Sequence, residues 1–131
     1  MRDQISDMIT RIRNGQKAGK KYVKLYNPTS TLCIKILHIL QAEGYIYYYK
    51  IENYNPLQVS VFLKFNLLGK PAINNINQIS MIGKRIYIKN KNLWNIKQGY
   101  GIFIISTPKG LMTQVDAKIN NYGGELLLHI S

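Results

Sequence analysis

Residues 102–113 read Ile102-Phe103-Ile104-Ile105-Ser106-Thr107-Pro108-Lys109-Gly110-Leu111-Met112-Thr113. The short apolar run that begins this stretch is typical of a buried strand, which we expect at Ile102–Ser106. The next four residues, Thr107 to Gly110, predict a turn, because proline and glycine interrupt regular structure. A short helix is expected near Met112–Asn121. Its inward side chains would be Met112, Val115, Ile119 and Tyr122.

The predicted turn carries side chains that suit contact with a nucleic acid. The hydroxyls of Ser106 and Thr107 can bind a phosphate, a ribose or a base edge, and Lys109 adds a positive charge. Gly110 lets the backbone approach a ligand closely, and a helix that starts there would favour an anion. An ordinary strand-to-helix turn with Ser and Thr caps explains the same residues, and composition alone favours that simpler interpretation.

Strands dominate the rest of the C-terminal half. We expect strands at Lys84–Lys89 and Glu125–Ile130, with Gly123-Gly124 ending the short helix. The sequence therefore predicts a strand-rich lobe at residues 79–131 with one short helix. A linker is expected before it, at residues 67–78.

The chain begins with a predicted amphipathic helix at Asp3–Asn14. Apolar residues recur there at i, i+3, i+4 and i+7 and form one stripe of Ile5, Met8, Ile9 and Ile12. Asp3 would cap the start, and Gly15 would end the helix in a left-handed conformation. Residues 16–21 would then form a basic loop.

A strand, a second helix and a hairpin are expected to complete the N-terminal lobe. The strand is placed at Tyr22–Tyr26 and the helix at Thr31–Glu43, which Gly44 would end. The hairpin arms are Tyr45–Glu52 and Leu57–Phe65, and the second arm alternates apolar and polar residues. The order α-β-α-β-β over residues 1–66 predicts helices packed on one face of a sheet. We interpret the chain as an α+β protein of two small lobes.

The charge balance points to a polyanionic partner. Eighteen Lys and Arg residues face six Asp and Glu residues, which gives a formal charge of +12. Nine of the basic residues lie in 1–50 and nine in 51–131, as expected of a folded basic surface rather than a charged tail. Such a surface attracts phosphates. Nucleic acid is favoured over acidic lipid, because no basic amphipathic helix stands out, and we expect no membrane partner.

Residues that could support catalysis or bind a metal are scattered. The six carboxylates show no spacing typical of a general acid and base, and neither His38 nor His129 has neighbours at metal-ligand spacing. The single cysteine, Cys33, lies on the apolar face of the second helix and is interpreted as a core residue. We therefore expect no enzyme, no cofactor, no metal site and no small-molecule substrate.

Read as a whole, the sequence resembles small-subunit ribosomal protein eight of the bacterial and organellar type. The matching motifs occur in one order along nearly the whole chain. They are residues 7–15 (DMITRIRNG), 28–30 (PTS), 43–46 (EGYI), 83–87 (GKRIY), 99–102 (GYGI), 106–113 (STPKGLMT) and 123–125 (GGE). The pair formed by the Ser-Thr-x-Lys-Gly and Gly-Gly-Glu motifs is the most specific.

This resemblance implies a structural protein that binds the central domain of the small-subunit rRNA and supports subunit assembly and translation. Its partners would be that rRNA and neighbouring small-subunit ribosomal proteins. The resemblance places the main RNA contacts in the C-terminal lobe, at Ser106, Thr107, Lys109, Gly110, Gly124 and Glu125. It places further contacts at Arg11, Arg13, Asn14, Ser30 and Lys64 in the N-terminal lobe, and at Arg85 and Tyr87 between the lobes.

Two positions depart from the family pattern. Pro108 replaces the usual second serine of the turn, which removes a hydroxyl and a backbone N–H. Ile82 replaces the proline before Gly83, so the turn there is expected to be less fixed. Both changes put individual RNA contacts in doubt.

Several interpretations stay open at this stage. A basic regulator that represses its own messenger is the second hypothesis, and a small enzyme acting on nucleic acid is the third. The tyrosines of Tyr45–Tyr49 could stack on bases, but we expect alternate ones to face the core; Trp94 could contact protein or RNA.

The 20 Ile, 13 Asn and 10 Tyr residues suggest an AT-rich genome. We expect a mitochondrial ribosome, with a plastid or the bacterial cytoplasm as alternatives.

Overall fold

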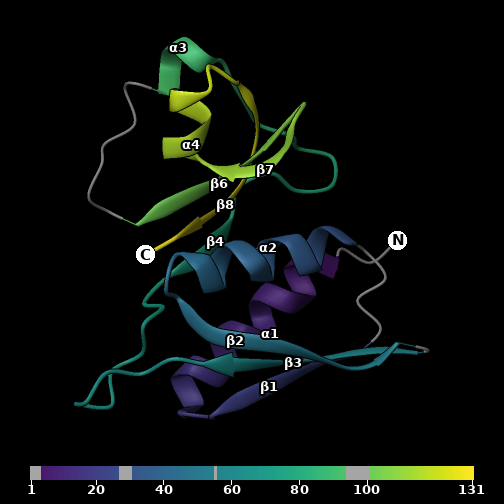
Figure 1. The fold of residues 1–131 in the computed structure, drawn as a ribbon, viewed down its shortest axis with the longest axis vertical. Coiled ribbons are helices and arrows are strands. Elements are labelled where there is room, and N and C mark those ends of the chain that lie inside the picture. The colour runs from purple at the N-terminus through teal and green to yellow at the C-terminus, as the bar shows by residue number, and fades with distance from the viewer. Residues whose placement is uncertain (1–3, 27–30, 55, 94–100) are drawn as a thin grey trace. The chain divides into compact units, whose positions relative to one another are not determined.

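A computed structural model describes residues 4–26, 31–54, 56–93 and 101–131 (Figure 1). The chain forms two compact units, Met1–Asn74 and Asn75–Ser131. The predicted linker divides between them. Asn66 and Lys70 close a turn that belongs to the first unit, with the Asn66 N–H donating to the Lys70 carbonyl oxygen (2.8 Å). Residues 76–78 form a strand of the second unit.

The first unit has the predicted α-β-α-β-β order. Its elements are α1 (Gln4–Ala18), β1 (Tyr22–Tyr26), α2 (Thr31–Ala42), β2 (Ile46–Tyr54) and β3 (Leu57–Leu63). The strands form an antiparallel sheet in the order β1-β3-β2, and both helices lie over one face of it (Figure 1). Successive side chains of a strand point to opposite faces of the sheet, and the side chains that point toward the helices are mostly apolar. The residues buried between sheet and helices include Met8, Ile9, Ile12, Leu25, Ile36, Leu37, Leu40, Val59, Val61 and Leu63.

The first helix is longer than predicted, and Gly15 does not end it. Gly15 is buried inside α1, where a side-chain carbon would lie 2.4 Å from Val23 Cγ1 and 2.9 Å from Leu63 Cδ1. The helix ends at Gly19, which has a φ of +71°. The N–H of Lys20 donates to the Gly15 carbonyl oxygen (3.0 Å), as in a Schellman motif. A glycine in a helical pattern serves either close packing or termination, and here it serves packing.

Two predictions about the next segment have different outcomes. Gly44, with a φ of +81°, ends α2 as predicted. The simple alternation expected of the tyrosines that follow is wrong, because the β2–β3 register shifts between Ile46 and Tyr48. Ile46 is therefore the buried residue, while Tyr47 and Tyr48 are both exposed.

The second unit is strand-rich, as predicted. Its elements are β4 (Ile76–Gln78), β5 (Tyr87–Ile88), α3 (Asn90–Leu93), β6 (Ile102–Thr107), β7 (Gly110–Thr113), α4 (Gln114–Ile119) and β8 (Gly124–Ile130). The strand order is β4-β8-β6-β7, and β5 also pairs with β8. A small core under the two short helices contains Leu93, Ile105 and Ala117. The predicted strand at Lys84–Lys89 is reduced to β5, and Trp94 lies outside the described residues.

The predicted helix at Met112–Asn121 is wrong in its start and in its buried face. The chain first folds back as β7, which pairs with β6, and α4 begins only after Thr113. The Thr113 hydroxyl caps the helix by accepting from the Asp116 N–H (3.4 Å). Val115 and Ile119 are exposed, whereas Ala117 is buried. The turn at Thr107–Gly110 is thus a hairpin turn, and no helix starts there.

Candidate nucleic-acid interface

The hairpin turn between β6 and β7 is held by a threonine side chain. The Thr107 hydroxyl donates to the Gly110 carbonyl oxygen (2.8 Å) and accepts from the Lys109 N–H (3.2 Å). Thr107 is 8% exposed, so its hydroxyl shapes the turn from inside. Pro108 and Lys109 occupy the exposed tip. Proline suits the first central position of a turn because its φ is fixed near −65°. The departure at Pro108 therefore fits the backbone of this turn.

A second segment meets this turn from the far end of the sequence. Ser106 on β6 pairs with Glu125 on β8, and Glu125 also pairs with Tyr87 on β5. The three side chains consequently form one row across three strands, since residues directly opposite in a sheet share a face. Gly124 lets the strands come together, because a side-chain carbon there would lie 2.1 Å from the Ser106 carbonyl oxygen.

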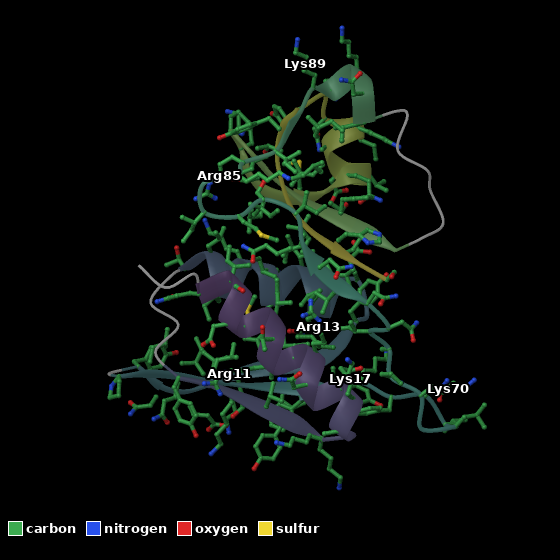
Figure 2. All side chains as sticks on the ribbon, turned by 180° about the vertical axis from the view of Figure 1, so that it is seen from behind. Arg11, Arg13, Lys17, Lys70, Arg85 and Lys89 are labelled. Atoms are coloured by element: carbon green, nitrogen blue, oxygen red, sulfur yellow. The ribbon has the colours of Figure 1, made fainter. Side chains whose placement is uncertain are left out.

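Arg85 completes this cluster, which we call the C-terminal patch: Arg85, Tyr87, Ser106, Lys109, Gly110, Gly124 and Glu125. The Arg85 Nη1 atom lies 3.5 Å from the Glu125 carboxylate, whose side chain is only 15% exposed. The Arg85 side chain remains half exposed, and Tyr87 is 72% exposed. Figure 2 shows Arg85 projecting from its loop. The patch combines a hydroxyl, an exposed phenol ring and the cationic side chains of Arg85 and Lys109.

The loop that carries Arg85 is also held firmly, despite the second departure from the family pattern. The Met81 N–H donates to the Lys84 carbonyl oxygen (2.9 Å), and the Lys84 N–H donates back to Met81 (3.0 Å). Gly83 has a φ of +84°, as the third residue of a type II turn requires. The Ser80 hydroxyl accepts from the Ile86 N–H (3.0 Å). The conformation of the turn at Ile82 is therefore held by the hydrogen bonds of Met81, Lys84 and Ser80 and by Gly83.

The predicted N-terminal contacts separate into different places. Arg11 and Asn14 line a hollow between α1 and β1, which we call the α1–β1 groove. Arg13 leaves α1 on a different side from Arg11 (Figure 2), as two residues two positions apart on a helix must. Lys64 lies elsewhere, with its Nζ atom 5.8 Å from the centre of the Tyr47 ring. Ser30 lies outside the described residues.

The groove contains residues that sequence reasoning did not select as site residues. Its full lining is Arg11, Asn14, Gly15, Ala18, Lys20, Lys21, Tyr22, Val23, Lys24 and Tyr26. The sequence does contain a signal for these residues, because Lys20, Lys21 and Lys24 lie within or next to the predicted strand Tyr22–Tyr26. Their convergence depends on Gly15, which lets α1 lie directly against Val23.

The side chains of these surfaces suit contact with a nucleic acid. In the part of the chain that the structure describes, no three His, Cys, Asp or Glu side chains are grouped to hold a metal ion. No described helix is long and apolar enough to cross a membrane. Cations, hydroxyls and aromatic rings on rigid strands can bind phosphates, riboses and bases.

Comparison with known proteins decides the family. A family model described as ribosomal protein S8 matches residues 3–131. The chain belongs to the ribosomal protein S8 family. This S8 chain is 47% identical to the small ribosomal subunit protein uS8 of Baumannia cicadellinicola over 133 residues, which cover 100% of this chain and 98% of that protein. It is 43% identical to uS8 of Blochmanniella pennsylvanica over 131 residues, with the same coverage. It is 40% identical to uS8 of Paramagnetospirillum magneticum over 132 residues, covering 99% and 98%.

Membership confirms the resemblance inferred from the motifs, and the α+β architecture agrees with it. The S8 family consists of structural components of the small ribosomal subunit and is not a family of enzymes. The named relatives are bacterial proteins, so they give no support to the expectation of a mitochondrial ribosome.

Proposed function

We propose that this S8 chain binds the central domain of the small-subunit rRNA and holds it in place during subunit assembly and translation. The row of Ser106, Glu125 and Tyr87 across three strands carries the proposal. These residues are far apart in the sequence, yet the strand register unites them beside the Lys109 turn. A rigid surface of this kind can recognise the shape of a folded RNA. Proteins do so through contacts with 2′-hydroxyls, phosphates and exposed bases.

Affinity and fit would come from different residues. The excess of Lys and Arg provides salt-dependent attraction to phosphates. Within the C-terminal patch, Ser106 offers a hydroxyl and Tyr87 an exposed ring. Lys109 and Arg85 would contact the phosphates of the RNA backbone. Glu125 holds Arg85 in position and can accept a hydrogen bond from a 2′-hydroxyl or a base. Arg11, Arg13, Asn14, Ser30 and Lys64 would add contacts from the first unit.

The ribosome that contains the chain is proposed to be bacterial. The named relatives from Baumannia, Blochmanniella and Paramagnetospirillum support this. The abundance of Ile, Asn and Tyr fits an AT-rich bacterial genome as well as an organellar one. Neighbouring proteins of the small subunit would be its other partners.

Binding to a hairpin from the central domain of the rRNA tests the proposal. Affinity is measured over a salt series, against an unrelated duplex of equal length. We expect preference for the hairpin at moderate salt, and loss of that preference in the Ser106→Ala, Lys109→Ala double variant. Lys70→Ala, which removes an exposed charge from a turn of the first unit, is the control and should keep the preference. Equal affinity of the wild type for both RNAs would contradict the proposal.

A further inference from the structure

The α1–β1 groove combines positive charge with aromatic surface. Four cations line it, Arg11, Lys20, Lys21 and Lys24, together with the rings of Tyr22 and Tyr26. None of its described lining residues carries a carboxylate. Asp7 lies nearby and is paired with Arg11 (3.5 Å). Three lysines therefore face the groove without an acidic residue in its lining, which favours an anionic ligand.

The tyrosines at the groove are held by the sheet. Tyr22 pairs with Phe62, and Phe62 pairs with Tyr48, so three rings form a row across β1, β3 and β2. The Phe62 and Tyr48 rings stack with centroids 4.3 Å apart, and the Tyr22 ring lies 5.7 Å from Phe62. The sheet ends at β1, and Tyr22 is still 47% exposed. One end of the row thus presents an aromatic surface beside the cations.

Tyr26 gives the groove a second ring. It is 58% exposed, and the Arg11 guanidinium carbon lies 5.9 Å from the centre of its ring. A guanidinium at this distance from an aromatic ring is weakly attracted to it.

Tyr22 and Tyr26 lie on the same side of β1, because they are four positions apart on a strand, and Lys24 lies between them on that side. This side is opposite to the one on which Val23 meets Gly15 of α1. The α1–β1 groove therefore includes the edge of β1 as well as the space beside α1.

We infer that the α1–β1 groove is a second RNA-binding site, which binds unpaired nucleotides. Lysines alone would accept the backbone of any duplex, but tyrosine rings add affinity only for bases whose faces are free to stack. The phosphates would contact Lys20, Lys21 and Lys24, and a base would stack on Tyr22 or Tyr26. A protein partner is less well matched, because it would have to be acidic and also cover aromatic rings. The inference rests on the proposed function in that the ligand is RNA and in that Arg11 and Asn14 line the groove, but it concerns a different surface from the C-terminal patch.

A short single strand tests this site separately from the C-terminal patch. The full chain is titrated with an adenosine hexanucleotide that contains 2-aminopurine, whose fluorescence falls when it stacks. We expect the Tyr22→Leu, Tyr26→Leu variant to bind about tenfold more weakly, because one base stacked on an aromatic ring contributes about a factor of this size or more. Tyr54→Leu removes a tyrosine that is 78% exposed and does not line the groove. This control should bind like the wild type.

The remaining variants separate the two sites. Ser106→Ala with Lys109→Ala should leave hexanucleotide binding unchanged, and the tyrosine variant should keep its preference for the rRNA hairpin. Circular dichroism establishes that each variant is folded. Equal hexanucleotide affinity in the wild type and the tyrosine variant would overturn the inference, even if the hairpin is bound specifically. Loss of a neighbouring protein from assembled subunits, with unchanged RNA binding, would also overturn it and assign the groove to a protein.

Discussion

Gly124 lies so close to Ser106 that a side-chain carbon on it would be 2.1 Å from the Ser106 carbonyl oxygen. The neighbouring atom belongs to the backbone of β6 and cannot rotate away. We expect Gly124→Ala to force β6 and β8 apart and to lower the free energy of unfolding by roughly 1–3 kcal/mol, the usual cost of overpacking. The row of Ser106 and Glu125 should be displaced, and rRNA affinity should fall as well.

A second glycine distinguishes general instability from damage to the patch. Gly69 has a φ of +79° and open space around it, so Gly69→Ala introduces backbone strain in the first unit only. Urea unfolding and rRNA binding are measured for both variants. Gly69→Ala should be less stable but bind normally. Normal binding by Gly124→Ala would show that this close approach does not shape the RNA site.

Gly15 should be intolerant of substitution although it lies within a helix. Alanine favours helices by about 1 kcal/mol over glycine, but a carbon at Gly15 would lie 2.4 Å from Val23 Cγ1. We expect Gly15→Ala to destabilise the chain by roughly 1–3 kcal/mol. The Gly15→Ala, Val23→Ala double variant removes the clashing methyl group and should be less destabilised than the sum of the single variants. A melting temperature raised by Gly15→Ala would refute the packing role.

The turn at Met81–Lys84 should accept the proline that the family pattern has at position 82. Ile82 is 60% exposed and precedes Gly83, whose φ of +84° marks a type II turn. Proline is favoured there and restricts the unfolded chain. Ile82→Pro should therefore raise the free energy of unfolding by about 0.4–1 kcal/mol. Thermal unfolding measures this, and Lys84→Pro, which removes an N–H that donates to Met81, should be destabilising.

Local periodicity was enough to predict most of the first unit. The apolar stripes of α1 and α2 and the alternation of β3 are repeated patterns within single segments, and they fixed the element order. The end of α1 was missed because Gly15 and Gly19 are equivalent as sequence signals. Only the position of Val23 in space decides that Gly15 is a packing site. The bulge near Tyr47 was missed for a similar reason, since it depends on β3.

The C-terminal patch was only partly predictable. The family resemblance selected Ser106, Lys109 and Glu125 as RNA contacts, and the strand register places Ser106 opposite Glu125. The helix start expected at the Thr107–Gly110 turn was wrong. A four-residue strand, β7, begins at Gly110 and occupies the expected start of the helix near Met112, because Leu111 and Met112 suit either structure. The row that joins Tyr87 to Glu125 depends on long-range strand pairing. Because β5 is only two residues long, its own sequence pattern does not specify the register of this pairing.

Tyr45 should make stability depend on pH in the alkaline range. Burial raises the pKa of its phenol above the usual value of 10.0, and the negative charge of Glu43 raises it further. The unfolded chain then loses this proton before the folded chain does. Stability from this group is present below pH 10 and is lost as the pH rises above it. Urea unfolding from pH 8 to pH 11 should show a smaller loss for Tyr45→Phe than for the wild type. Tyr54→Phe, at a tyrosine that is 78% exposed, should follow the wild type.

Glu125 is the one acidic residue placed in the C-terminal patch, and its charge should increase specificity at the cost of total affinity. It holds Arg85 at 3.5 Å and is mostly shielded from solvent. Glu125→Gln removes a charge that repels phosphates, so affinity for unrelated duplex should rise slightly. It also releases Arg85 and weakens an acceptor for 2′-hydroxyls, so affinity for the cognate hairpin should fall about ten- to a hundredfold, as expected for a lost charged hydrogen bond of roughly 1.5–3 kcal/mol. Glu52→Gln is the control. It breaks a different pair, with Lys50 at 3.9 Å, and should change neither the affinity for the unrelated duplex nor the affinity for the cognate hairpin. If Glu125→Gln strengthened binding to both RNAs equally, Glu125 would act only as a repulsive charge, and its role in positioning Arg85 for rRNA would be refuted.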